Sequence, residues 1–142
     1  QSPFKFYFSD IGLRNARLGF RQVEETHLME NIIYNELRSR GYSVDVGVVE
    51  KRGTNENGKE YKNQLEIDFV ANLGSKRYYI QSAYNIPGEE KWEQETRPFE
   101  KTNDSFKKIV VVEKSIKPRR DDKGYVMIGI KEFLLNNDSL EV

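Results

Sequence analysis

The chain has 142 residues, a length that one domain with a single hydrophobic core can fill. It contains no cysteine, so disulfides, thiolate metal sites and a thiol nucleophile are excluded. Its 23 basic residues equal its 23 acidic ones, so bulk charge favours neither nucleic acid nor membrane, and no apolar run approaches the length of a membrane span. We therefore expect a soluble, cytoplasmic domain without a membrane partner.

The first part of the chain predicts a leading segment followed by a long helix. Residues 1–22 begin with Gln1-Ser2 and no initiator methionine, so we expect the chain to be part of a longer protein. From Val23 to Arg40 apolar residues recur at three- and four-residue spacing, which predicts an amphipathic helix that ends at Gly41. Glu30 falls at the edge of the apolar face, a half-shielded position that suits a metal ligand.

The rest of the chain predicts strands and helices in turn. A strand is expected over residues 42–48, and the polar, glycine-rich residues 53–62 predict a hairpin loop. Further strands are expected at 63–72, 77–84, 109–112 and 125–130, with helices at 87–103, distorted near Pro98, and at 131–135. The order is helix, three strands, helix and strand, followed by an appended strand and helix.

Two of these strands carry the residues of chemical interest. In the first, the side-chain period of two separates Leu65, Ile67, Phe69 and Ala71 from Glu66, Asp68 and Val70. In the second, Gln81 and Ala83 share one face. Glu30, Asp68 and Gln81 then form a candidate magnesium site, since two or three protein oxygens suffice for this ion. Hydrolysis of a phosphodiester would also require a metal-activated water and a nearby cation, commonly a lysine.

This pattern resembles the PD-(D/E)XK nuclease superfamily, through the Glu in the first helix, Glu66-Ile67-Asp68-Phe69-Val70, and the third motif Gln81-x-Ala83. More narrowly, residues 7–15 and 28–37 resemble a domain of uncharacterised function that follows the ATPase module in archaeal and bacterial AAA-type ATPases. The resemblance implies an α/β single domain over residues 1–142 with an αβββαβ, restriction-endonuclease-like core and a mixed central sheet flanked by helices. It also implies a partner, the N-terminal ATPase module of the parent chain, whose nucleotide-binding residues are not in this sequence.

The chain departs from the superfamily at the position of the catalytic lysine. An active member carries acid-x-lysine where this chain has Gln81-Ser82-Ala83, so the site is degenerate. Glutamine offers a metal a neutral, weaker oxygen, and alanine polarises nothing. The candidates for a displaced cation are Lys76, Arg77 and Lys91.

We therefore expect an accessory module that binds nucleic acid, DNA or RNA, or a protein partner without cutting it. The alternatives are a working magnesium-dependent nuclease with a displaced lysine and a purely structural oligomerisation domain. Cationic side chains expected to contact a nucleic acid or partner are Lys117, Arg119, Arg120, Arg14 and Arg17. For the first three the other interpretation is a solvated turn, and for the last two it is an exposed helix face.

Overall fold

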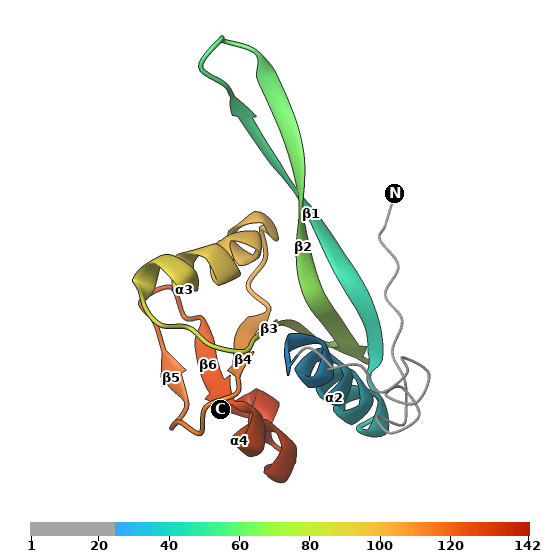
Figure 1. The fold of residues 1–142 in the computed structure, drawn as a ribbon. Coiled ribbons are helices and arrows are strands. Elements are labelled where there is room, and N and C mark those ends of the chain that lie inside the picture. The colour runs from blue at the N-terminus through green and yellow to red at the C-terminus, as the bar shows by residue number, and fades with distance from the viewer. Residues whose placement is uncertain (1–24) are drawn as a thin grey trace, which may run out of the picture.

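The computed structural model describes residues 25–142 (Figure 1). The predicted segment 1–22, with Arg14 and Arg17, lies outside the described residues. The helices are α2 (Glu25–Ser39), α3 (Glu89–Thr96) and α4 (Ile130–Leu135), with 3-10 turns η1 (Arg97–Lys101) and η2 (Ser139–Glu141). The strands are β1 (Ser43–Thr54), β2 (Glu60–Leu73), β3 (Lys76–Ala83), β4 (Lys107–Val112), β5 (Arg119–Arg120) and β6 (Val126–Gly129).

The strands form one mixed sheet in the order β1-β2-β3-β4-β6-β5. The first three pair antiparallel, whereas β4 lies parallel to β3 and to β6, and β5 closes the edge antiparallel to β6. Helix α3 lies in the crossover that parallel pairing of β3 and β4 requires. The described residues therefore form an α/β domain with a mixed sheet, as the sequence predicted, and this sheet has six strands.

Two apolar clusters cover the two faces of the sheet. Cluster 1 joins Ile80 and Val111 of the sheet to α2 and α4, whose contributions include Ile33 and Phe133. Cluster 2 joins the alternate sheet residues to η1, which inserts Phe99, and to α3, with Trp92 packed against it; its buried sheet members are Ile67, Tyr79, Ala83, Val110 and Val112. Strand β4 is buried on both faces, as its all-apolar sequence predicted.

The ends of the two longest predicted helices agree with their sequence signals. Gly41 follows α2 with a φ of +93°, the left-handed conformation that glycine adopts at low cost. The predicted distortion near Pro98 is a change from α3 to the 3-10 turn η1, with the proline at its start.

The predicted hairpin loop is wrong in extent, because five of the ten residues 53–62 belong to strands. Only residues 55–59 form the loop, in which Asn55 Oδ1 accepts the N–H groups of Asn57 and Lys59. Below it, Lys62 pairs with Glu50 at 2.9 Å, and the Tyr61 ring lies where a side chain on Gly53 would be. These cross-strand contacts support the polar sequence as a long ribbon that projects from the body (Figure 1).

The predicted alternation along β2 is wrong at Ile67, because a β-bulge interrupts it. Asp45 pairs with Val70 but Gly47 pairs with Ile67, so β2 holds one extra residue at this point. Ile67 consequently packs in cluster 2, whereas Phe69 packs in cluster 1. A Cβ on Gly47 would lie 2.8 Å from Val70 Cγ2, so the close approach of the strands at the bulge requires glycine.

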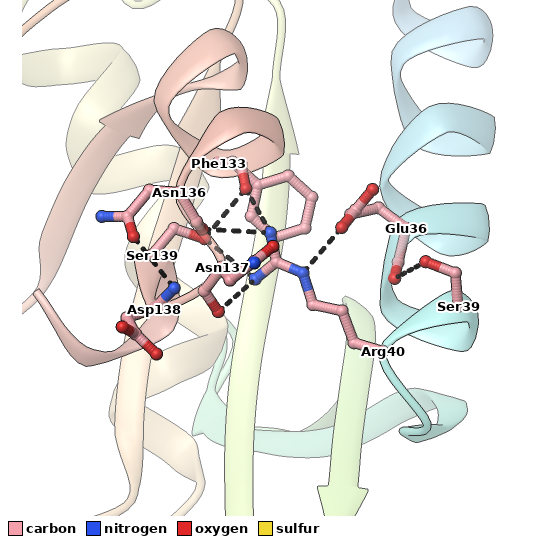
Figure 2. Close-up of polar contacts among 8 residues, drawn as sticks. All are labelled: Glu36, Ser39, Arg40, Phe133, Asn136, Asn137, Asp138 and Ser139. Carbon is pink, nitrogen blue, oxygen red and sulfur yellow. Dashed lines mark hydrogen bonds and ion pairs between the residues drawn. The ribbon is translucent and has the colours of Figure 1, made fainter.

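Arg40 fixes the C-terminal segment to the end of α2 (Figure 2). Its guanidinium donates to the Phe133 and Asn136 carbonyls at the end of α4 and to Ser139 Oγ at 3.0 Å. Its Nε pairs with Glu36 at 2.7 Å, and its charge lies 4.8 Å from the centre of the Phe133 ring. A cation is therefore placed where helix carbonyls lack intrahelical donors. None of the helices in residues 25–142 is long and apolar enough to cross a bilayer.

Candidate functional site

The candidate site lies where β2 and β3 stop pairing through their backbones. Their ladder runs from Leu73 and Lys76 to Phe69 and Ile80, next to Asp68. Beyond it, side chains replace the backbone bonds. Gln81 Oε1 accepts the N–H of Asp68 at 2.7 Å, and Asp68 Oδ2 accepts the N–H of Ser82 at 2.8 Å. The structure thus places two of the three predicted ligands in contact, each bonded to the backbone of the opposite strand.

The Gln81 side chain is occupied at both ends. It is 4% exposed, and its Nε2 donates to the Glu95 carbonyl near the end of α3 at 2.9 Å. An N–H faces one end of the amide and a carbonyl faces the other, which fixes the assignment of its oxygen and nitrogen. Gln81 therefore links β2, β3 and α3, a role that glutamate cannot fill because an ionised carboxylate donates no hydrogen bond.

Ala83, at the position of the absent lysine, is buried. It lies on the same sheet face as Gln81, as strand parity predicted, and it belongs to cluster 2. Its neighbours in that cluster include Phe99 and Val112. A methyl group completes an apolar contact here, whereas a lysine ammonium would be removed from water.

Glu30 approaches the sheet from a different layer. It is half-buried on α2, the helix whose buried side chains Met29, Ile33 and Leu37 pack in cluster 1. Gln81 lies on the other face, towards α3. The convergence of Glu30 with Asp68 and Gln81 stays a prediction.

A magnesium site at Asp68 stays a prediction. One oxygen each of Asp68 and Gln81 already accepts a backbone N–H, and Gln81 brings no charge. Within residues 25–142 no group of three or more His, Cys, Asp or Glu side chains is arranged to hold a metal ion. The arrangement is suited to holding the strands together where their ladder ends.

The displaced cations proposed from the sequence differ in where they lie. Lys76 and Arg77 are at the opposite end of β3, where Arg77 Nε donates to Asn72 at 2.7 Å. Lys91 lies on α3 and pairs with the Glu95 carboxylate at 2.9 Å, one turn from the carbonyl that Gln81 contacts. Lys91 therefore lies on the helix whose Glu95 carbonyl contacts Gln81.

The predicted basic turn is partly a strand. Arg119 and Arg120 form β5 and pair with Met127 and Val126, so this segment is an edge of the sheet rather than only a turn. Both arginines are exposed, as is Lys117. Their role as nucleic-acid or partner contacts stays a prediction.

One polar network was missed by the sequence reasoning. Asp104 Oδ2 accepts the Tyr79 hydroxyl at 2.5 Å, while Oδ1 accepts the Lys108 ammonium at 3.2 Å and the Phe106 N–H at 3.1 Å. Burial alone would raise the Asp104 pKa, but these donors outweigh it and the pKa lies below the usual value. Burial, and then the contact with Asp104, raise the pKa of Tyr79. Asp104 lies in the polar segment that connects η1 to β4. Its sequence neighbours do not indicate that its carboxylate has these partners.

Comparison with known proteins gives one relative with a distant match. A protein of Haemophilus influenzae, described only as an uncharacterized protein, is 31% identical over 131 residues. The match covers 92% of this chain and 28% of that protein, so the chain spans little more than a quarter of its relative. No family model and no solved structure matches the chain.

Proposed function

We propose that this chain is a non-hydrolysing accessory module of a larger protein, built on a nuclease-like scaffold. The hydrogen bonds of the Gln81 side chain support it best. Its oxygen accepts the Asp68 N–H, and its nitrogen donates to the Glu95 carbonyl. The methyl group of Ala83, two residues further along β3, packs in cluster 2. Both positions of the acid-x-lysine motif thus hold the fold together, Gln81 by hydrogen bonds and Ala83 by apolar contact. Neither side chain offers a charge to a scissile phosphate.

The nuclease-like scaffold is supported by the order and pairing of the elements. A helix, three antiparallel strands, a crossover helix and a strand parallel to the third follow one another, which is the αβββαβ order that the sequence resemblance implies. The strands separate next to Asp68, so the acid of the second motif lies at the end of a ladder.

The larger protein is proposed to be an AAA-type ATPase, with its ATPase module N-terminal to this domain. This rests on the sequence resemblance and on the relative, in which the matched segment is 28% of a longer chain. The module would bind nucleic acid or a protein partner on behalf of the ATPase. The parent protein should then hydrolyse ATP, whereas residues 1–142 alone should not.

A nuclease assay tests the absence of hydrolysis. Pure protein is incubated with single- and double-stranded DNA and RNA in Mg²⁺ or Mn²⁺, beside the variant Asp68→Asn, which keeps an acceptor for the Ser82 N–H. Asp45→Asn, on an exposed residue of β1, is the matched control. We expect no cleavage above buffer from any of the three proteins. Cleavage that Asp68→Asn removes and Asp45→Asn retains would refute the proposal.

The second candidate, a working magnesium-dependent nuclease, is favoured by one observation only. Lys91 is held by Glu95, whose carbonyl contacts Gln81, so a cation lies on the helix that covers the Asp68–Gln81 contact. If the assay detects cleavage, Lys91→Ala should abolish it. Cleavage that persists in this variant would exclude Lys91 as the displaced lysine.

A further inference from the structure

Strand β1 forms one edge of the sheet and, among the described strands, pairs only with β2. It is 12 residues long, contains no proline and carries four valines: Val44, Val46, Val48 and Val49. The opposite edge, β5, has two residues, both exposed arginines, and follows directly after Pro118. A short, charged edge next to a proline resists pairing with another chain. Neither its length nor a proline protects β1 in this way.

The bulge next to Asp68 leaves β1 itself regular. The extra residue belongs to β2, and the side chains of β1 alternate without interruption from Val44, which packs against cluster 1, to Val49, which packs against cluster 2. A bulge in the edge strand would bend it and disrupt its pairing. Within the described part of the chain, the outer side of β1 therefore presents a continuous row of unpaired backbone N–H and C=O groups.

The far half of β1 belongs to the ribbon that projects from the body (Figure 1). A two-stranded ribbon is marginally stable in water when nothing else supports it. The ion pair between Lys62 and Glu50 joins two exposed side chains, and such pairs contribute little. A further strand beside β1 would add backbone hydrogen bonds along the length of the ribbon. The ribbon is therefore the part of the fold that a partner strand would stabilise most.

Asp45 and Lys51 place opposite charges towards the two ends of β1. Asp45 opposes Val70 and points to the cluster 2 face, and Lys51, six residues further along a regular strand, points to the same face. Neither side chain forms an ion pair within residues 25–142, whereas Glu50 pairs with Lys62 and with Arg52. An antiparallel copy of the strand would bring each of these two charges beside its opposite.

One register of β1 with the β1 of a second copy joins both charges. A two-fold axis perpendicular to the sheet keeps each face continuous, and opposed residues share a face. With the axis at Val48, midway between them, Asp45 of each copy opposes Lys51 of the other, and Val48 opposes its own copy. Moving the axis by one residue in either direction places a valine or a glycine opposite Asp45 and loses both ion pairs. The charges therefore select a single register.

We propose that two copies of this domain associate through antiparallel pairing of their β1 strands, with Val48 on the two-fold axis. The two sheets become one, each ribbon gains a third strand, and the β1 edges are closed in a symmetric dimer. This goes beyond the proposed function, because it names a surface and its partner, a second copy of the chain. It does not rest on the nuclease-like scaffold, so the result of the nuclease assay does not bear on it.

Sedimentation equilibrium of the 142-residue chain at low salt tests the pairing. The wild type should show a monomer–dimer equilibrium. Lys51→Glu and Asp45→Lys each replace two attractions by two repulsions, so each should raise the Kd at least about tenfold. An equimolar mixture of these two variants should form heterodimers within about threefold of the wild-type affinity, because each chain then faces opposite charges on the other. Lys59→Glu, in the hairpin loop outside the paired residues, is the matched control and should change the Kd less than about twofold.

Cysteine cross-linking tests the register, since the chain has no native cysteine. Val48→Cys places two thiols on the axis, so a short bismaleimide should link the two copies rapidly. In Val46→Cys and in Glu50→Cys the equivalent thiols are offset by four residues along the paired strands, about 13 Å, and should link far more slowly.

Several results would overturn the proposal in protein that circular dichroism shows to be folded. The first is a wild-type chain that stays monomeric up to about 1 mM. The second is a Kd unchanged by Lys51→Glu and by Asp45→Lys, and the third is a mixture of these variants that associates no better than either alone. Cross-linking of Val46→Cys or Glu50→Cys as fast as that of Val48→Cys would refute the register and, with it, the pairing of Asp45 with Lys51.

Discussion

The substitution Gln81→Glu separates a structural glutamine from a vestigial metal ligand. The introduced carboxylate can still accept the Asp68 N–H, now 2.7 Å from Oε1. Its second oxygen would face the Glu95 carbonyl, which Nε2 now approaches to 2.9 Å, so a hydrogen bond becomes a repulsion between two acceptors. A buried group that loses its partner costs about 1–3 kcal/mol, and a negative charge near the Asp68 carboxylate adds to this.

We expect the free energy of unfolding to fall by about 3 kcal/mol at pH 7.5. Burial and the nearby acceptors raise the folded-state pKa of the introduced carboxyl above its unfolded value. The penalty is therefore fully present above the folded pKa and is largely lost below the unfolded pKa of about 4.3, where the protonated acid donates to Glu95.

Urea unfolding at pH 4.0 and 7.5 measures both effects. With a denaturant slope of roughly 2 kcal/mol/M, the midpoint at pH 7.5 should drop by about 1.5 M. Gln94→Glu, an exposed position beside Glu95, is the matched control and should change stability by less than about 0.5 kcal/mol. A Gln81→Glu protein as stable as the wild type at pH 7.5, or one with a pH-independent penalty, would refute the structural role of Gln81.

Three further substitutions test the fold that carries the site. Arg40→Ala should cost about 3 kcal/mol, because several charge-assisted bonds to the end of α4 are lost together, whereas the exposed Arg38→Ala should cost less than about 1 kcal/mol in the same urea titration. Gly129→Ala should cost at least about 2 kcal/mol, because its Cβ would lie 2.6 Å from the Lys114 backbone oxygen; a change below about 0.5 kcal/mol would show that this loop yields. The pKa of Asp104 is lowered in the folded protein, so its stabilisation is present above the unfolded pKa of about 3.9 and is lost as pH falls through the lower folded pKa. Asp104→Asn should therefore flatten the acid limb of the stability profile, and an unchanged limb would contradict this.

The order of elements could be predicted because their signals are local. The apolar spacing of α2, the glycine after it and the all-apolar run of β4 each appear within a few neighbouring residues. The bulge in β2 was not predicted, because it depends on how β2 pairs with β1. Gly47, within a valine-rich strand, was the available signal, since glycine there indicates a close approach of two backbones.

Part of the candidate site was predictable, since the contact between Asp68 and Gln81 is present, whereas the place of Glu30 beside them stays a prediction. Strand parity placed Gln81 and Ala83 on one face, and the structure puts Gln81 against Asp68. What Gln81 does there depends on the Glu95 carbonyl, fourteen residues along the chain on another element. A sequence pattern identifies the side chain but not its hydrogen-bond partner. That partner decides whether Gln81 is available as a metal ligand or links elements of the fold.

The double substitution Gln81→Glu with Ala83→Lys restores the acid-x-lysine spacing and tests whether the site around Asp68 keeps ligand geometry. The sequence alone suggests a simple rebuilding, since both side chains point to one face. The structure adds that Ala83 is 4% exposed within cluster 2, so a lysine there is both too large and desolvated. We expect a folded but less stable protein whose calorimetric affinity for Mg²⁺ and Mn²⁺ equals that of the wild type.

The control Ala83→Met separates size from charge in this experiment. Methionine resembles lysine in length without its ammonium, so its cost measures crowding alone, and the remainder in Ala83→Lys measures desolvation. The two introduced charges lie two residues apart on one strand face, and their attraction should make the double variant less unstable than the single costs predict. If the double variant instead binds metal more tightly and cleaves DNA, the oxygens of Glu30 and Asp68 still converge, and the nuclease alternative replaces the non-hydrolysing module. Unchanged metal affinity in the folded double variant would mean that the site no longer has ligand geometry, and it would favour an interaction module in which Gln81 joins β2, β3 and α3.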